Sequence, residues 1–293
     1  MKGKVCLITG ATSGLGLETA IGLAKLGATV AITARAREKG EAARREVRRR
    51  ANADAELFVA DLSLMGEVRR LAAEARSRHP ALHVLVNNAG IHTKRRTVTV
   101  EGFETVLATN YLAPFLLTGL LLDALKAGKS SRIVNVSSMR HFTARFDPAD
   151  LRDGGFAHGT FAHAYGRTKL MLAMWSHELA ERISGTGVTV NAMCPGGVAT
   201  GIWKRDRGFG PALVRFLMMS LLKGPELAAR LPVRLASAPE LEGVTGKYFQ
   251  VRAHIPWQSW DPAKTEERSA PATYDKSARK LLWESTESLL AGK

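Results

Sequence analysis

VCLITGATSGLG, residues 5–16, decides the fold of this chain. Its first four residues are a short continuous apolar run, which is typical of a strand buried on both faces of a parallel sheet. Glycines follow at positions 10, 14 and 16, and a helical pattern then extends to Leu26. A glycine turn between a strand and a helix lets backbone N–H groups approach a pyrophosphate at the positive helix end. The stretch predicts a dinucleotide-binding turn, with a purely structural turn as the alternative.

Apolar strand-like runs and helical patterns alternate along the rest of the chain. This alternation predicts an α/β fold with a doubly wound parallel sheet, in one domain that spans residues 1–293. A polar, loop-like segment is expected at residues 258–272, and a closing helix at residues 277–290. The further strands are expected at residues 29–33, 56–60, 82–86, 132–138 and 188–193, with a last strand at 247–249.

The composition is that of a soluble globular protein, with 45% hydrophobic and 24% charged residues. The net charge of +15 is unusual, and arginine-rich stretches such as residues 44–50 contribute much of it. These stretches alternate with acids and apolar residues, which favours the solvated faces of amphipathic helices. An anionic cofactor, an anionic membrane surface or nucleic acid are the competing explanations. No zinc spacing, helix-turn-helix signal or aromatic-basic RNA motif supports nucleic acid, so we expect none as a partner.

Both cysteines, Cys6 and Cys194, lie within apolar runs, which predicts buried thiols in a reducing compartment rather than a disulfide. The first strand begins almost at the N-terminus, so we expect no signal peptide and no membrane anchor. The longest apolar stretch, residues 111–125, is interrupted by a proline, a glycine and an aspartate. It is shorter than the roughly 20 residues that a bilayer requires, so we expect a buried core helix. The protein is expected to be soluble and cytoplasmic.

Tyr165 and Lys169 lie four residues apart in a stretch that is expected to be helical as far as Arg182. Positions i and i+4 share a helix face, so the ammonium is expected close to the phenol. A free tyrosine has a pKa of about 10, and a nearby positive charge lowers that pKa toward the working range. The pair by itself is more often a buried aromatic residue beside a solvated lysine. Its interpretation therefore depends on the rest of the chain.

The ordered set of motifs resembles the short-chain dehydrogenase/reductase family. The motifs are the glycine spacing G-x-x-x-G-x-G, N-N-A-G at residues 87–90, S-S at 137–138 and Y-x-x-x-K at 165–169. An insert at residues 146–151 and the G-K-Y-F at 246–249 are similar to the retinol-dehydrogenase-like branch. The resemblance covers nearly the whole chain and implies a Rossmann fold. It also implies hydride transfer between NADP(H) and a lipophilic carbonyl or alcohol, retinol- or retinal-like or another aldehyde or ketone.

The resemblance also implies four catalytic residues. Ser138 is expected to bind the substrate oxygen, and Tyr165 to donate or accept the proton. Lys169 is expected to lower the pKa of Tyr165 and to hold the nicotinamide ribose. Asn110 is expected to position a water behind Lys169, although a lone asparagine is also common as a structural hydrogen-bonding residue. No metal is expected.

Arg35 ends the second strand, 19 residues past Gly16, where the residue that distinguishes the two nicotinamide cofactors is expected. An acid there would hold the ribose hydroxyls of NAD, whereas an arginine suits a 2′-phosphate. The prediction is therefore NADP(H), and the alternative is a merely solvated arginine. The other cofactor contacts implied by the resemblance are Gly10, Ser13, Gly14, Leu15, Gly16, Asp61, Leu62, Asn88, Ala89, Gly90, Pro195 and Gly196, together with Tyr165 and Lys169.

In the family, a flexible lid covers the substrate, and the resemblance implies a lid at about residues 200–224 and a C-terminal extension from about residue 250. Residues 208–222 are basic and rich in Leu, Met and Phe, which suits a lipophilic substrate wall, a peripheral membrane contact or core packing. A non-catalytic NADP(H)-binding scaffold or sensor is the alternative function. Loss of the serine, tyrosine or lysine would mark it, and all three are present. The substrate and the oligomeric state stay open.

Overall fold

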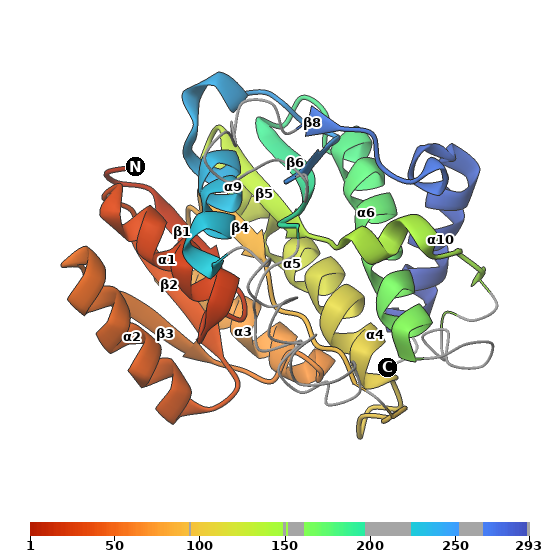
Figure 1. The fold of residues 1–293 in the computed structure, drawn as a ribbon, viewed down its shortest axis with the longest axis horizontal. Helices are drawn as coiled ribbons and strands as arrows, with labels where there is room; N and C mark the ends of the chain where they lie inside the picture. Colours follow the sequence, from red (N-terminus) through yellow and green to blue (C-terminus); the bar gives the residue numbers. More distant parts are fainter. Residues whose placement is uncertain (94, 149–150, 152–160, 197–223, 252–265, 292–293) are drawn as a thin grey trace, which may run out of the picture.

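The computed structural model describes residues 1–93, 95–148, 151, 161–196, 224–251 and 266–291. Their centre is an eight-stranded sheet in the order β3-β2-β1-β4-β5-β6-β7-β8 (Figure 1). The first seven strands pair in parallel, and β8 pairs antiparallel with β7. The strands are β1 (Val5–Ile8), β2 (Thr29–Ala34), β3 (Ala55–Val59), β4 (Val84–Asn87), β5 (Ser131–Val136), β6 (Val188–Cys194), β7 (Lys247–Gln250) and β8 (Glu266–Glu267).

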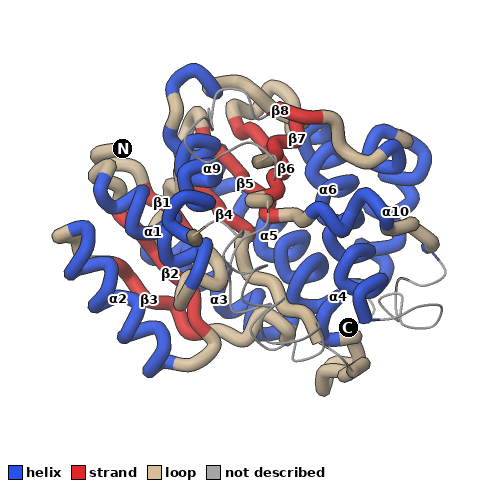
Figure 2. Tube along the Cα trace, in the orientation of Figure 1, coloured by secondary structure: helices blue, strands red, loops and turns tan. Residues whose placement is uncertain are grey.

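Helices cover both faces of the sheet, as the blue tubes around the red strands show in Figure 2. On one face lie α1 (Gly14–Lys25), α2 (Arg37–Ala51) and α9 (Pro225–Ser237). On the other face lie α3 (Met65–Arg78), α5 (Ala113–Ala127) and α6 (Phe161–Arg182), and α10 (Lys276–Ala291) packs beside α6. The expected doubly wound, mostly parallel Rossmann sheet is therefore confirmed.

Strand β1 shows why a continuous apolar run was needed. Leu7 contributes to the core beneath α3 and α5, whereas Cys6 and Ile8 contribute to the core beneath α1 and α9. Successive side chains of a strand point to opposite faces, so a strand with helices on both sides has no polar face. Cys6 and Cys194 are both buried and free, as expected.

The position of the site is set by the switch point of the sheet, where β1 and β4 lie side by side. Strand β4 is the neighbour of β1 opposite β2, so the chain reverses its direction of winding between them. In open α/β sheets, ligands bind outside the carboxyl ends of the strands at such a switch point. The glycine turn after β1 and the N-N-A-G segment after β4 lie side by side there.

The C-terminal part corrects the sequence-based prediction in two places. The strand at 247–249 is not the last, because Glu266 and Glu267 pair with Phe249 and Tyr248. The stretch expected to be a loop also contains the 3₁₀ turn η7 (Pro271–Tyr274). A two-residue strand carries no periodic pattern, and its hydrogen bonds come only from the edge of β7. The closing helix is confirmed as α10, whereas the expected lid at about 200–224 lies almost entirely outside the described residues.

One helix of the described part, Thr105–Ala127, is long and apolar enough to cross a membrane by length and composition. Of its most apolar window, 67% is buried inside the protein. Its residues pack against the sheet, α3 and α6, which is the environment of a core helix.

Candidate active site

The glycine turn after β1 leaves no room for side chains. Gly10 has a positive φ of 65°, and a Cβ there would lie 2.7 Å from the Cα of Ala89. A Cβ on Gly16 would fall against Nδ2 of Asn88 and 2.6 Å from the carbonyl oxygen of Gly10. Gly14 also has a positive φ, of 56°. Glycine is therefore required at these positions by the close approach of two backbone segments and by the left-handed conformation.

Asn88 fastens the end of β4 to this turn. Its Nδ2 donates to the carbonyl oxygens of Thr9, at 2.8 Å, and Gly10, at 3.1 Å. In return, Oγ1 of Thr9 accepts from the backbone N–H groups of Asn88 and Ala89, both at 3.0 Å. These bonds hold the two carboxyl ends of β1 and β4 as one rigid edge.

The N-terminus of α1 is open to an anionic group. Ser13 is its N-cap residue, and the Ser13 side chain makes no capping hydrogen bond within the described structure. The first turn of α1 contains no acidic residue, and Leu15 behind it is buried. The unpaired N–H groups and the helix dipole therefore favour negative charge at this point. This arrangement fits the pyrophosphate of a dinucleotide.

The ends of β2 and β3 lie along the same edge. Arg35 directly follows β2, is exposed and makes no ion pair with any described residue. Asp61 follows β3, and its Oδ1 accepts from the backbone N–H of Ser63 at 2.9 Å and from its hydroxyl at 2.7 Å. Leu62 beside it is buried. The structure thus offers a free guanidinium and an oriented carboxylate where the adenosine end of a dinucleotide is expected.

Ser138, Tyr165 and Lys169 meet at the ends of β5 and β6. Ser138 lies two residues past the end of β5, and its hydroxyl is close enough to that of half-buried Tyr165 on α6 to lower the pKa of the phenol by hydrogen bonding. Lys169, one helical turn later, is buried, and its Nζ donates to the carbonyl oxygen of Val136 at 2.8 Å. Its Nζ lies 5.7 Å from the centre of the Tyr165 ring. A Cβ on Gly90 would lie 3.2 Å from the same Nζ, so Gly90 lets the N-N-A-G segment pass close to Lys169.

Burial dominates the electrostatics of this group. It raises the pKa of Tyr165 to about 12, whereas the hydrogen bond from Ser138 and the charge of Arg140 lower it. Burial also lowers the pKa of Lys169 to about 8. Both shifts have one cause, because exclusion of water disfavours the charged form of each group. The expected lowering of the Tyr165 pKa by Lys169 stays a prediction, since here the ammonium is hydrogen-bonded to Val136 and burial outweighs the other influences.

Asn110 lies in the π-helical turn η1 (Ala108–Leu112), which leads into α5. Its Oδ1 accepts from the backbone N–H of Ile91 at 2.8 Å, and its Nδ2 donates to the carbonyl oxygen of Ile91 at 3.0 Å. Nδ2 also donates to Oγ1 of Thr168 at 3.2 Å, next to Lys169. The side chain therefore clamps the N-N-A-G segment to α6. Its role in positioning a water stays a prediction.

Pro195 and Gly196 follow β6 at the same edge. Gly196 has a positive φ of 75°, and a Cβ there would lie 2.8 Å from the carbonyl oxygen of Val251. Its N–H donates to Sγ of Cys194 at 3.4 Å. The predicted site residues thus lie at the carboxyl edge of the sheet, on the segments that follow β1 to β6, on the helices α1 and α6, and, for Asn110, on the turn η1 that leads into α5.

A sequence model of the short-chain dehydrogenase family matches residues 4–150 and 152–208, which is more than half of the chain. The chain belongs to the short-chain dehydrogenase family. It is therefore an oxidoreductase that acts on alcohol or carbonyl groups with a nicotinamide cofactor. The glycine cradle and the open end of α1 fit that cofactor.

Curated relatives within the family share more than a third of the residues. Mouse retinol dehydrogenase 13 is 37% identical over 283 residues, which cover 94% of this chain and 83% of the relative. Human retinol dehydrogenase 14 is 37% identical over 305 aligned residues, which cover 98% and 86%. Mouse polyprenol dehydrogenase is 38% identical over 258 residues, which cover 86% and 76%. The chain thus belongs to a retinol-dehydrogenase-like part of the short-chain dehydrogenases.

Solved structures agree with this assignment. An uncharacterised protein from Mycobacterium paratuberculosis has a TM-score of 0.77 at 28% identity and covers 99% of this chain, which covers 94% of it. A protein described as an NAD(P)-dependent gluconate 5-dehydrogenase, from Beutenbergia cavernae, has a TM-score of 0.71 at 28% identity, with coverages of 89% and 98%. That structure holds NADP.

Three residues near Ser138, Tyr165 and Lys169 of this short-chain dehydrogenase were not predicted from the sequence. The ring of His92 meets that of Tyr165 edge to face, with centroids 5.4 Å apart. Arg140 lowers the pKa of Tyr165 by its charge. His141 is completely buried behind Ser138. The position of His92 two residues after the N-N-A-G segment was a signal that could have been used, whereas nothing in the local pattern marked Arg140 or His141.

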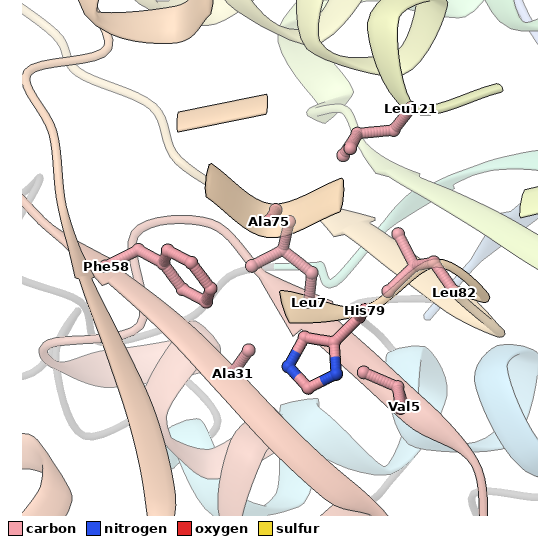
Figure 3. A pocket seen from close by; sticks show the side chains of 8 residues that line it. All are labelled: Val5, Leu7, Ala31, Phe58, Ala75, His79, Leu82 and Leu121. Carbon is pink, nitrogen blue, oxygen red and sulfur yellow. The ribbon is translucent and has the colours of Figure 1, made fainter. Parts of the chain in front are cut away.

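A small apolar pocket lies away from the site, beneath α3 (Figure 3). Val5 begins β1, so the pocket lies toward the amino ends of the strands, opposite the edge that carries Tyr165. His79 lines it and is paired with Glu56 at 3.0 Å. Its lining residues are Val5, Leu7, Ala31, Phe58, Ala75, His79, Leu82 and Leu121, most of which belong to the core, so we regard it as a packing defect.

Proposed function

We propose that this short-chain dehydrogenase transfers hydride between NADP(H) and a primary alcohol or aldehyde at the end of an isoprenoid-like, lipophilic chain. The observation that carries the proposal is the identity of 37–38% to enzymes named for retinol and for polyprenol. Both compounds are long apolar chains that end in a primary alcohol. A substrate of this kind also suits the Leu-, Met- and Phe-rich stretch at residues 208–222, which we propose to be the lid.

The chain's own residues would divide the chemistry among them. NADP(H), when bound, supplies or accepts the hydride. In the reducing direction Ser138 donates a hydrogen bond to the substrate oxygen, and Tyr165 gives it the proton. In the oxidising direction the phenolate of Tyr165 removes that proton, so this direction is favoured by high pH. Lys169 holds the nicotinamide ribose, and the glycine turn and Ser13 bind the pyrophosphate.

The preference for NADP(H) over NAD(H) rests on Arg35. Its guanidinium is exposed and unpaired within the described structure, and a planar fork of donors matches a phosphate. Arg37 lies two residues further and is also exposed, so it can share the contact. Charge-assisted hydrogen bonds contribute roughly 1.5–3 kcal/mol each, which corresponds to tenfold or more in affinity.

The cofactor proposal is tested by steady-state kinetics with both cofactors. We expect NADPH to be used at least about tenfold better than NADH, and Arg35→Asp to erase or reverse this ratio. Arg69→Asp is the matched control, because Arg69 is an exposed arginine on α3 and its loss should leave the ratio unchanged. Equal use of the two cofactors by the wild type would refute the assignment of Arg35.

The substrate proposal is tested with a series of aldehydes of increasing isoprenoid length, followed by NADPH consumption. We expect kcat/KM to rise with chain length, because each buried CH₂ contributes about 0.8 kcal/mol. A flat or falling series would point to a small polar substrate. No turnover with any member, together with tight NADPH binding, would favour the alternative of a non-catalytic NADP(H) scaffold.

We also propose that residues 1–293 form a single catalytic domain that works in the cytoplasm. The buried character of Thr105–Ala127 supports its role as a core helix. Peripheral contact of the lid with a membrane is compatible with a lipophilic substrate. Fractionation of cells that express the protein would test this location, and recovery with the membranes after a high-salt wash would overturn it.

A further inference from the structure

His141 is a buried histidine three residues after Ser138, in the 3₁₀ turn η2 (Met139–Thr143). Its Nδ1 lies 2.7 Å from the carbonyl oxygen of Ser138. Its Nε2 lies 2.9 Å from Oγ of Ser269 and 3.3 Å from the backbone nitrogen of Ala270. One ring thus joins the segment that carries the predicted catalytic serine to the C-terminal segment more than 120 residues later.

The partners fix the tautomer of this ring. A carbonyl oxygen only accepts, so Nδ1 of His141 must carry the proton that reaches Ser138. A backbone N–H only donates, so Nε2 must be the unprotonated acceptor for Ala270. Burial lowers the pKa of His141 to about 4, so the ring stays neutral above that pH. His141 is therefore a permanent hydrogen-bond donor to the backbone of Ser138, and it does not titrate at neutral pH.

Packing fixes the orientation of the ring as well. The rings of Phe142 and Tyr248 lie 4.0 Å and 4.9 Å from that of His141, centre to centre. Ala270 is 3% exposed, and its carbonyl oxygen accepts from the N–H and the hydroxyl of Thr273. Pairing of β8 with β7 holds the chain just before this point. The anchor behind His141 is therefore rigid.

The hydroxyl of Ser138 is held less firmly than its backbone. Its Oγ accepts from the backbone N–H of Arg140 at 3.3 Å, which is a long hydrogen bond. Its carbonyl oxygen accepts two bonds from His141, one from the backbone N–H at 3.0 Å and one from the ring. The position of the serine relative to Tyr165 thus depends on the backbone at Ser138, and the ring of His141 supplies the shorter of the two hydrogen bonds to its carbonyl oxygen.

We infer that His141 is a positioning residue, which places the Ser138 hydroxyl against Tyr165 through its Nδ1–H and is itself held by Ser269 and Ala270. The inference rests on the proposed function, since it concerns the geometry of the same reaction. It gives the C-terminal segment, which contains no predicted catalytic residue, a part in organising the catalytic group.

Two substitutions test the contacts of the two ring nitrogens separately. His141→Asn keeps an N–H donor near the position of Nδ1 and loses the contact with Ala270. His141→Gln reaches the position of Nε2 with its amide and loses the donor to Ser138. We expect His141→Gln to lower kcat about tenfold or more while the Kd of NADPH and the KM of the aldehyde change less than about twofold, because only the transition state loses an interaction. His141→Asn should keep kcat within about threefold of the wild type.

His83→Gln is the matched control. His83 is partly buried, burial lowers its pKa as well, and its Nδ1 accepts from the backbone N–H of Val5 at 3.0 Å. Val5 begins β1, so His83 lies at the edge of the sheet opposite Ser138. Its replacement should lower Tm and leave kcat unchanged. A loss of kcat that follows Tm across all three variants would show that His141 is merely structural, and would overturn the inference.

Crystal structures of the two His141 variants provide a test that does not depend on turnover. We expect the Ser138 hydroxyl to move away from Tyr165 in His141→Gln and to stay in place in His141→Asn. An unmoved serine in both variants overturns the inference even if no substrate has been found. Absence of turnover in the wild type, with the serine displaced only in His141→Gln, would instead overturn the proposed function alone.

Discussion

Gly10→Ala is the substitution whose cost follows most directly from the geometry of the glycine turn. Gly10 has a left-handed φ of 65°, and a Cβ there would lie 2.7 Å from the Cα and 3.0 Å from the Cβ of Ala89. A left-handed residue other than glycine costs roughly 1–2 kcal/mol. Overpacking at a close contact typically costs about 1–3 kcal/mol more. We therefore expect a loss of about 2–5 kcal/mol in the free energy of unfolding.

Gly185→Ala is the control that separates these two costs. Gly185 has a φ of 80°, and nothing lies within 4 Å of the Cβ that it would acquire. It should lose only the roughly 1–2 kcal/mol of backbone strain. Urea unfolding, followed by tryptophan fluorescence, measures both variants. NADPH binding should weaken at least about tenfold in Gly10→Ala alone, because the displaced N-N-A-G segment borders the cofactor site.

Two results would refute this reasoning. Equal losses of stability in the two variants would show that the approach of Ala89 to Gly10 costs nothing. Full rescue of Gly10→Ala by Ala89→Gly would contradict it too, since the shortest contact is with the Cα of Ala89, which that change leaves in place.

Tyr165→Phe should abolish turnover while the Kd of NADPH stays near the wild-type value, because only the proton donor is lost. Steady-state rates and fluorescence titration of NADPH measure the two quantities, and an active variant would remove Tyr165 from the mechanism. Arg140→Ala should raise the pKa of Tyr165 further, because the charge of Arg140 lowers that pKa now. The rise of the alcohol oxidation rate with pH should therefore shift to higher pH, and an unshifted pH–rate profile would count against this role of Arg140. Gly119→Ala should stabilise the protein by about 0.5–1 kcal/mol, since Gly119 lies inside α5 with open space at its Cβ position; an unchanged or lower midpoint of urea unfolding would contradict the assignment. Acid should destabilise the protein between pH 6.5 and about 4, because the pKa of His177 is lowered to about 4 on folding and the unfolded chain then binds the extra proton. His177 should contribute on the order of 3 kcal/mol to this loss, and His141 should add a similar amount, because its pKa is also lowered to about 4. His177→Gln should therefore reduce, but not abolish, the slope of stability against pH in that range.

The sequence by itself determined the order and type of nearly all described elements. Buried parallel strands need continuous apolar runs, and helices that cover a sheet need apolar residues at helical spacing, so both signals are local. The glycines of the first turn could be predicted for the same reason, since only glycine tolerates a left-handed backbone against another segment. The expectation that Tyr165 and Lys169 share one helix face is likewise a matter of helical geometry, and α6 spans both residues.

Only the tertiary structure decided which groups meet at the carboxyl edge. Asn110 lies in a π-helical turn and binds the backbone of Ile91 through its side chain, and no spacing in the sequence predicted that turn. One of the two partners that fix the tautomer of His141, the backbone N–H of Ala270, lies more than 120 residues away. Strand β8 exists only because the edge of β7 supplies its hydrogen bonds. The pKa of Tyr165 depends on burial, which is a property of the whole packed core. Local periodicity encodes the faces of helices and strands, whereas long-range hydrogen bonds and the exclusion of water arise only when those faces are assembled.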